Sequence, residues 1–80
     1  STKELMALAI TIALCGDHAI ASHIHDAVCA GALRSEIIEA IGVAVMTGSE
    51  LAVAHGAKAL EVLEQYDEAA MLEEYLEPCC

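Results

Sequence analysis

The chain has 80 residues, 58% of them hydrophobic, and a formal net charge of −10 from 13 acidic and three basic residues. This charge disfavours nucleic acid and anionic membrane surfaces as partners, and charged residues interrupt every apolar run before it could span a bilayer. A chain of this length buries a small share of its surface. Its apolar excess therefore predicts a homo-oligomer, in which partner subunits cover the apolar surface.

The chain shows no secretory-signal pattern, since it begins Ser-Thr-Lys-Glu. Its four cysteines, at positions 15, 29, 79 and 80, lack the spacing of a zinc ribbon. We therefore expect reduced thiols and a cytoplasmic protein. His25 and Cys29 lie one helical turn apart and would supply only two metal ligands. We expect no metal and no cofactor within one chain, with a site on an oligomer axis as the alternative.

Apolar residues recur at helical spacing and predict an all-α domain. The first helix is expected over residues 3–14, apolar nearly all round as a buried helix is. The second is expected from Asp17, as its N-cap, to Ala30, with Gly31 as the terminating glycine. The third is expected from Arg34 or Ser35 to residue 47.

The fourth helix is expected over residues 50–66. Gly56 lies inside it, where glycine is unfavourable by about 1 kcal/mol against alanine, so it predicts the close approach of a neighbouring helix. The remaining segment carries an excess of acids and is expected to form a short helix and tail ended by Pro78. We therefore divide the chain into a main domain, residues 1–66, and an acidic C-terminal helix and tail, residues 67–80.

The residues whose side chains could take part in catalysis lie mainly at the junction of the first two helices. Cys15 lies there, near the positive end of the next helix, where thiolate chemistry is favoured. One hypothesis is a nucleophilic thiol at Cys15 with His18 as its base, assisted by Glu4 or His23. A second is acid–base catalysis by His23 and Glu4 alone. The third is a helical oligomer whose histidines only pack.

The spacing of Glu4, Gly16, Ala19 and His23 resembles the signature Glu-x11-Cys-x2-Cys-x3-His of the carboxymuconolactone decarboxylase and alkylhydroperoxidase D superfamily. The resemblance covers residues 3 to about 65. It implies an all-α, alkylhydroperoxidase D-like fold built around a helical hairpin and assembled as trimers or hexamers. In the peroxidase branch of that superfamily, the two cysteines form a redox pair and acidic and histidine side chains relay protons. Glu4, His18 and His23 match that relay.

The departure from this signature is that Gly16 and Ala19 occupy both redox positions. Cys15, the only nearby thiol, is displaced by one residue, and a sulfenic acid without a resolving thiol has no efficient way back. We therefore expect an antioxidant ancestry with the peroxidase activity lost or altered. Two alternatives are a non-catalytic self-assembling component and a lactone decarboxylase-like enzyme, because the decarboxylase branch works without the cysteine pair.

A second departure lies near the start of the third helix. The superfamily usually has a threonine cap there and a long polar side chain near the end of the second helix, where this chain has Leu33 and Cys29. Together these residues predict an apolar patch and an additional protein contact. Loss of the redox pair with gain of a patch could arise in an engineered scaffold or by natural drift.

Overall fold

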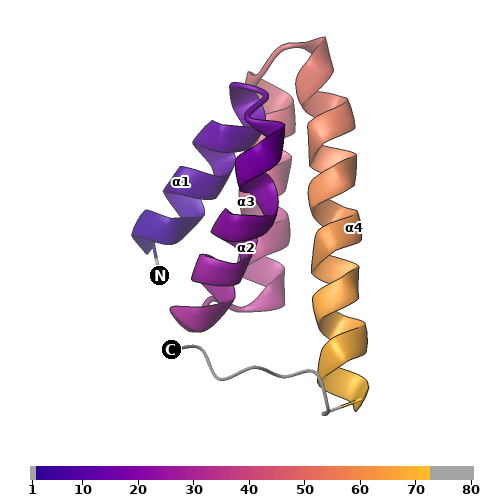
Figure 1. Cartoon of the computed structure of the whole chain (residues 1–80). Helices are drawn as coiled ribbons and strands as arrows, with labels where there is room; N and C mark the ends of the chain where they lie inside the picture. The colour runs from indigo at the N-terminus through magenta and orange to yellow at the C-terminus, as the bar shows by residue number, and fades with distance from the viewer. Residues whose placement is uncertain (1, 73–80) are drawn as a thin grey trace.

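The computed structural model describes residues 2–72, and its regular elements in that range are all helical. Helix α1 comprises Thr2–Ala13, a 3₁₀ turn (η1) covers Asp17–Ala19, and α2, α3 and α4 comprise Ile20–Cys29, Arg34–Thr47 and Glu50–Leu72. Figure 1 shows α1 and α3 running in one direction and α2 and α4 in the other. The predicted all-α architecture is confirmed for the described residues.

The junction between α1 and α2 differs from its prediction at the start of α2. Asp17 was expected to be the N-cap, but it begins the 3₁₀ turn, and Ala19 occupies the cap position without a side-chain hydrogen bond. The turn is closed by the Ala19 N–H, which donates to the Gly16 carbonyl at 3.0 Å. This short turn takes the place of the first turn of α2, so the prediction of Asp17 as the cap of α2 was wrong.

The end of α2 follows its prediction. Gly31 has a φ of +92°, the left-handed conformation that glycine adopts without a steric penalty. Its N–H donates to the Val28 carbonyl, and the Ala32 N–H donates to the Ala27 carbonyl, both at 3.0 Å. These two bonds form a Schellman motif, which satisfies the last carbonyls of the helix. The prediction of Gly31 as the terminating glycine is confirmed.

Helix α4 is longer than expected. It was predicted to end near Tyr66, yet it continues to Leu72, because no glycine or proline lies between these positions to stop it. Pro78, Cys79 and Cys80 lie outside the described residues. The division into a main domain and an acidic tail therefore stays a prediction.

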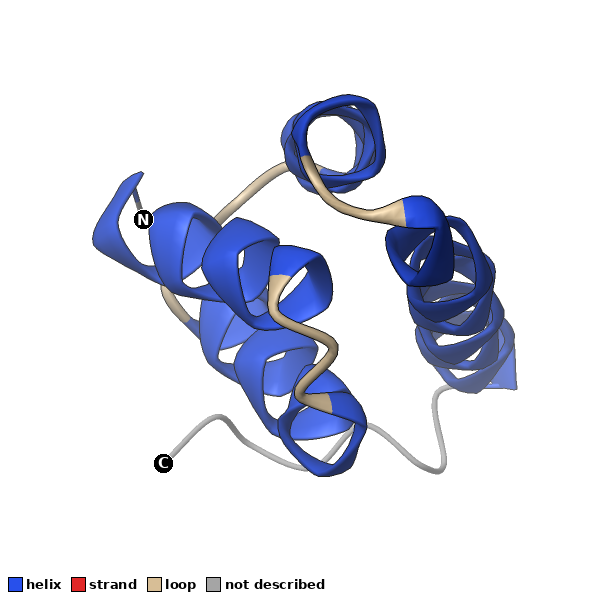
Figure 2. Ribbon diagram, turned by 90° about the horizontal axis from the view of Figure 1, so that it is seen from above, coloured by secondary structure: helices blue, strands red, loops and turns tan. Residues whose placement is uncertain are grey.

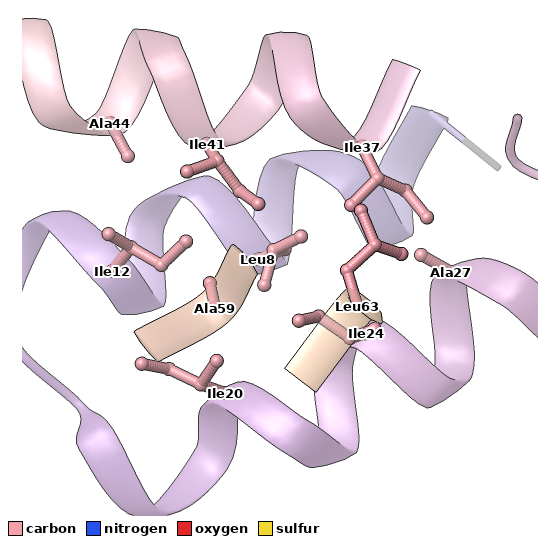
Figure 3. Close-up of a cluster of buried hydrophobic side chains, with 10 residues drawn as sticks. All are labelled: Leu8, Ile12, Ile20, Ile24, Ala27, Ile37, Ile41, Ala44, Ala59 and Leu63. Carbon is pink, nitrogen blue, oxygen red and sulfur yellow. The ribbon is translucent and has the colours of Figure 1, made fainter. Parts of the chain in front are cut away.

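A single cluster of buried aliphatic side chains joins the four helices, as Figure 3 shows. Leu8 of α1 is completely buried within it, as are Ile12 and Ile24. Helix α1 packs against α2 and α3, while α4 packs against α3 and more lightly against α1 and α2. Seen from above in Figure 2, α3 lies between α1 and α4. The core therefore lies on the inner side of α3.

Two expectations about packing have different outcomes. A Cβ at Gly56 would lie 2.5 Å from Cγ2 of Val45 on α3, so the predicted close approach of a neighbouring helix is confirmed. The prediction of a wholly buried α1 was wrong, since Met6 and Ile10 are more than half exposed. The apolar residues of α1 therefore serve two faces, one in the core and one on the surface.

None of the described helices combines the length and apolarity that crossing a bilayer requires.

Candidate functional site

Cys15 terminates α1 in an unusual backbone conformation. Its N–H donates to the Ile12 carbonyl at 3.1 Å, and the Gly16 N–H donates to the Thr11 carbonyl at 2.8 Å. This is again the Schellman pattern, with Cys15 in the position that glycine usually takes. Cys15 has a φ of +60° and is the one non-glycine residue with a positive φ in the described part of the chain. The thiol is free and half-buried.

Replacing Cys15 with glycine should stabilise the chain. The left-handed conformation is unfavourable for an L-residue with a Cβ by roughly 1–2 kcal/mol, and part of that gain is offset by the greater freedom of glycine in the unfolded chain. We expect Cys15→Gly to raise the free energy of unfolding by about 1 kcal/mol in urea titrations. Cys15→Ala removes the sulfur but keeps the Cβ, so it should show no such gain. An equal gain for both variants would contradict the strain argument.

Gly16 and Ala19, which occupy the two redox positions of the signature, lie together at this junction. The hydrogen bond between their backbones holds them one turn apart, so two cysteines placed here would face each other at short range. A Cβ at Gly16 would lie 3.1 Å from Cγ2 of Thr11, a contact that a small movement of that side chain relieves. The junction could therefore accept the missing sulfurs.

The other predicted catalytic residues are spread along the hairpin. His18 is exposed on η1, and His23 is half-buried in the second turn of α2. Glu4 is half-buried in the first turn of α1, and helical rise separates its Cα from that of Cys15 by roughly 16 Å. Within residues 2–72, no hydrogen bond or ion pair joins any two of these four residues. The structure groups Cys15 and His18 at the junction and leaves Glu4 at the opposite end of α1.

A second polar cluster joins α2 to α4. The Tyr66 hydroxyl lies 2.9 Å from His25 Nδ1, and His25 Nε2 lies 3.4 Å from Cys29 Sγ. Both ring nitrogens of His25 therefore have a partner, the Tyr66 hydroxyl at Nδ1 and the Cys29 sulfur at Nε2.

This cluster was only partly predictable from the sequence. The spacing of His25 and Cys29 placed them on one stripe of α2, whereas Tyr66 lies 41 residues away from His25 and no local pattern indicates it. Among residues 2–72, no group of three or more histidine, cysteine or acidic side chains has the arrangement of a metal site.

The ionisation of Tyr66 in this cluster makes the unfolding free energy depend on pH. Burial, and to a lesser degree the charge of Asp26, raises the pKa of Tyr66 above 10.0. The folded chain therefore holds the phenol proton more tightly than the unfolded chain, and this stabilisation is complete below pH 10 and is lost as the pH rises through the folded pKa. We expect the unfolding free energy to fall with pH above 10, and to fall less steeply in Tyr66→Phe. Identical slopes in pH-dependent urea titrations would contradict this assignment.

Leu33 occupies the N-cap of α3 without serving as a cap. Its backbone is extended, and no side-chain hydrogen bond caps the helix. The Glu36 carboxylate accepts a hydrogen bond from the Leu33 N–H at 2.8 Å, which is one half of a capping box. The Leu33 side chain is 64% exposed, whereas Cys29 is half-buried beside His25. Of the two residues in the predicted patch, Leu33 is the one that faces solvent.

Replacing Leu33 with threonine should complete the capping box. The threonine hydroxyl could accept a hydrogen bond from the Glu36 N–H, the reciprocal bond that Leu33 cannot make. We expect Leu33→Thr to raise the free energy of unfolding by about 1 kcal/mol, measured by chemical denaturation. Leu33→Val, which is also β-branched but has no hydroxyl, is the control and should give no comparable gain.

The chain that forms this helical hairpin and its junction matches a known protein family. The family model described as the carboxymuconolactone decarboxylase family matches residues 1–65. The chain belongs to this family, and the resemblance drawn from the signature spacing is confirmed at that level. Neither the curated proteins nor the solved structures gave a significant match.

Proposed function

We propose that this chain is a member of the carboxymuconolactone decarboxylase family that has lost its thiol peroxidase chemistry and serves as a self-assembling homo-oligomer component. The observation that carries the loss is the absence of sulfur at both Gly16 and Ala19. Peroxide reduction by a dithiol needs a thiolate nucleophile and a second thiol to resolve the sulfenic acid. Neither glycine nor alanine supplies either group.

We propose that Cys15 does not replace the missing thiol nucleophile. Its backbone is held in the left-handed conformation by the hydrogen bonds that end α1, and it lies one residue before the signature position. Glu4 lies at the far end of α1, and His18 is exposed. The other cysteine of residues 2–72 is Cys29, at the far end of α2, so within that range oxidation of Cys15 would leave a sulfenic acid without an adjacent resolving thiol. We propose that Glu4, His18 and His23 are remnants of the proton relay.

The assembly part of the proposal is supported by exposed apolar surface. Among the residues whose burial the structure describes, ten large hydrophobic side chains are exposed, and Leu14 and Met46 are each 78% exposed. Large apolar side chains on a protein surface often mark a site of interaction with another protein. We propose a homo-oligomer of trimeric or hexameric type in the cytoplasm. Leu33, beside Cys29, would add a contact beyond that assembly.

A cysteine-independent, lactone decarboxylase-like reaction is the second candidate. The observation that favours it is that Glu4 and His23, the acid–base pair it would use, are both half-buried. Such an enzyme should be indifferent to blocking of the Cys15 thiol and sensitive to His23→Gln.

Two measurements test the proposed function. Sulfenic-acid trapping followed by mass spectrometry should recover no more adduct at Cys15 after peroxide treatment than at an ordinary exposed thiol, and rapid, complete trapping would contradict the loss of chemistry. Light scattering should give a mass several times that of the 8.4 kDa chain, and a monomer would contradict the assembly. Leu33→Arg should reduce any mass beyond that of a plain trimer or hexamer. An unchanged mass would contradict the proposed contact through Leu33.

A further inference from the structure

We propose that the polar cluster between α2 and α4 is a site of thiol–disulfide exchange with low-molecular-weight disulfides. Cys29 is the exchanging sulfur, His25 carries its proton, and Tyr66 positions the ring of His25. Cys29 ends α2, whereas Gly16 and Ala19 lie at the junction before that helix. Exchange at Cys29 therefore needs neither of the redox positions that this chain has lost.

The three side chains have the arrangement of a nucleophile, a base and a group that orients the base. His25 Nε2 lies 3.4 Å from Cys29 Sγ, and His25 Nδ1 lies 2.9 Å from the Tyr66 hydroxyl. When Nδ1 carries the ring hydrogen and donates it to the hydroxyl oxygen of Tyr66, the lone pair of Nε2 faces the sulfur. This order of contacts is the one that activates a cysteine for nucleophilic attack.

Two helices hold the imidazole ring in place. His25 and Cys29 are four residues apart on α2, so they share one face of that helix. The ring of Tyr66, from α4, lies 6.1 Å from that of His25 between centroids and is tilted by 38° to it. All three residues are half-buried. The packing of α4 therefore fixes the ring, while a small reagent can still reach the cluster from solvent.

The position of Cys29 makes its reactivity depend on His25. Cys29 is the last residue of α2, and the last turn of that helix contains no basic residue. The partial negative charge at a helix C-terminus opposes the formation of a thiolate. His25 supplies the compensating positive charge when it takes the thiol proton at Nε2, so the thiolate and the imidazolium form as a pair.

Exchange is a single displacement at sulfur. The thiol proton of Cys29 passes to His25 Nε2, the thiolate attacks one sulfur of the small disulfide, and a new S–S bond forms as the old one breaks. The departing small thiolate takes the proton from the imidazolium. One thiol and one disulfide thus become one mixed disulfide and one small thiol. In the reverse direction a small thiolate attacks a disulfide of Cys29, and His25 protonates the departing Cys29 sulfur.

The charge of the chain favours cationic disulfides as substrates. Its net charge is −10, and Asp26, next to His25 in the sequence, is exposed. A negative field attracts cations and repels anions, and salt screens it. Added salt should therefore slow the exchange of Cys29 with cystamine, a cationic disulfide, and accelerate its exchange with glutathione disulfide, an anionic one.

The experiment mixes the phosphine-reduced full chain with cystamine and measures the rate at each cysteine by peptide mass spectrometry. A Cys79→Ser/Cys80→Ser background leaves Cys15 and Cys29 as its thiols, and Cys15 is the internal reference. An ordinary thiol is only slightly ionised at pH 7, and a gain in thiolate is partly offset by a lower nucleophilicity. We therefore expect His25→Gln to lower the Cys29 rate about fivefold and to leave the Cys15 rate unchanged.

Further comparisons separate this role from a structural one. Loosened packing exposes a half-buried thiol and raises its rate, whereas loss or misplacement of the base lowers it. Tyr66→Phe keeps the ring and removes the hydroxyl, so it should lower the Cys29 rate, by less than His25→Gln does. His55→Gln, the same replacement at a half-buried histidine of α4, should leave it unchanged. At about pH 9.5, where an ordinary thiol ionises unaided, the parent and His25→Gln should converge.

Unchanged or raised Cys29 rates in both His25→Gln and Tyr66→Phe, with the helix content intact by far-UV circular dichroism, would overturn the exchange site. Equal losses at Cys15 and Cys29 would also overturn it, because they would mark a global effect. If His25→Gln does not fold, the sign of the change in Tyr66→Phe decides the question. A cystamine rate at Cys29 that rises with added salt would overturn the preference for cationic disulfides.

Discussion

Replacing Leu8 with alanine should lower the free energy of unfolding by about 2–5 kcal/mol, the range for deleting a buried leucine side chain. Leu8 is completely buried in the cluster that joins the helices. The loss combines the transfer free energy of the removed carbons with the cavity they leave. A domain of this size has an unfolding free energy of roughly 5–10 kcal/mol, so this one change removes a large share of it.

Leu51→Ala is the matched control for this prediction. Leu51 lies in the first turn of α4 and is mostly exposed, so the same truncation there should change the unfolding free energy by no more than about 0.5 kcal/mol. Urea titrations of both variants, followed by circular dichroism, measure the difference. Equal losses at the two positions would mean that the core does not lie where the structure places it.

The second large effect is a difference between two Gly→Ala substitutions at helix positions with the same intrinsic preference for alanine. Gly42 and Gly56 both lie inside helices, where alanine is favoured over glycine by about 1 kcal/mol. A Cβ at Gly42 meets nothing, whereas a Cβ at Gly56 would lie 2.5 Å from Cγ2 of Val45 and 3.5 Å from that of Ile41. Overpacking of this kind destabilises by about 1–3 kcal/mol. We expect Gly42→Ala to stabilise the chain and Gly56→Ala to destabilise it.

These two variants are best compared by urea titration at one low protein concentration, at which association contributes little to the measured stability. The intrinsic helix preference cancels in this comparison, so the expected difference between their unfolding free energies is the overpacking cost, about 1–3 kcal/mol. If Gly56→Ala gained as much stability as Gly42→Ala, α3 and α4 would have to lie further apart than the structure indicates.

Much of the fold was predictable because helix signals are local. The apolar period predicted each helix, and Gly31 predicted the end of α2. Gly56 predicted the close approach of a neighbouring helix to α4. The start of α2 was not predictable from local signals. Asp17 has the chemistry of an N-cap, yet the chain forms a 3₁₀ turn there, in which the Ala19 N–H donates to the Gly16 carbonyl. Turn geometry of this kind depends on how α1 ends, which no single residue encodes.

The candidate site was predicted less completely. Spacing identified the junction and its missing sulfurs, but it gave no information about the backbone strain at Cys15, which arises from the hydrogen bonds that end α1. It also gave no indication of Tyr66, because that residue reaches His25 through the packing of α4 on α2. Similarly, the apolar composition of α1 suggested a buried helix. Only the fold separates the core side, with Leu8, from the surface side, with Ile10.

The central claim is that the fold and the relay residues remain while the nucleophiles are absent. The most direct test measures peroxide consumption with excess dithiol by this chain and by Gly16→Cys/Ala19→Cys, each also prepared with Thr11→Ser to relieve the contact at position 16. We predict no turnover above the Cys15→Ala background for the parent and measurable turnover for the double variant. Turnover by the parent, with the sulfenic acid trapped at Cys15, would contradict this account.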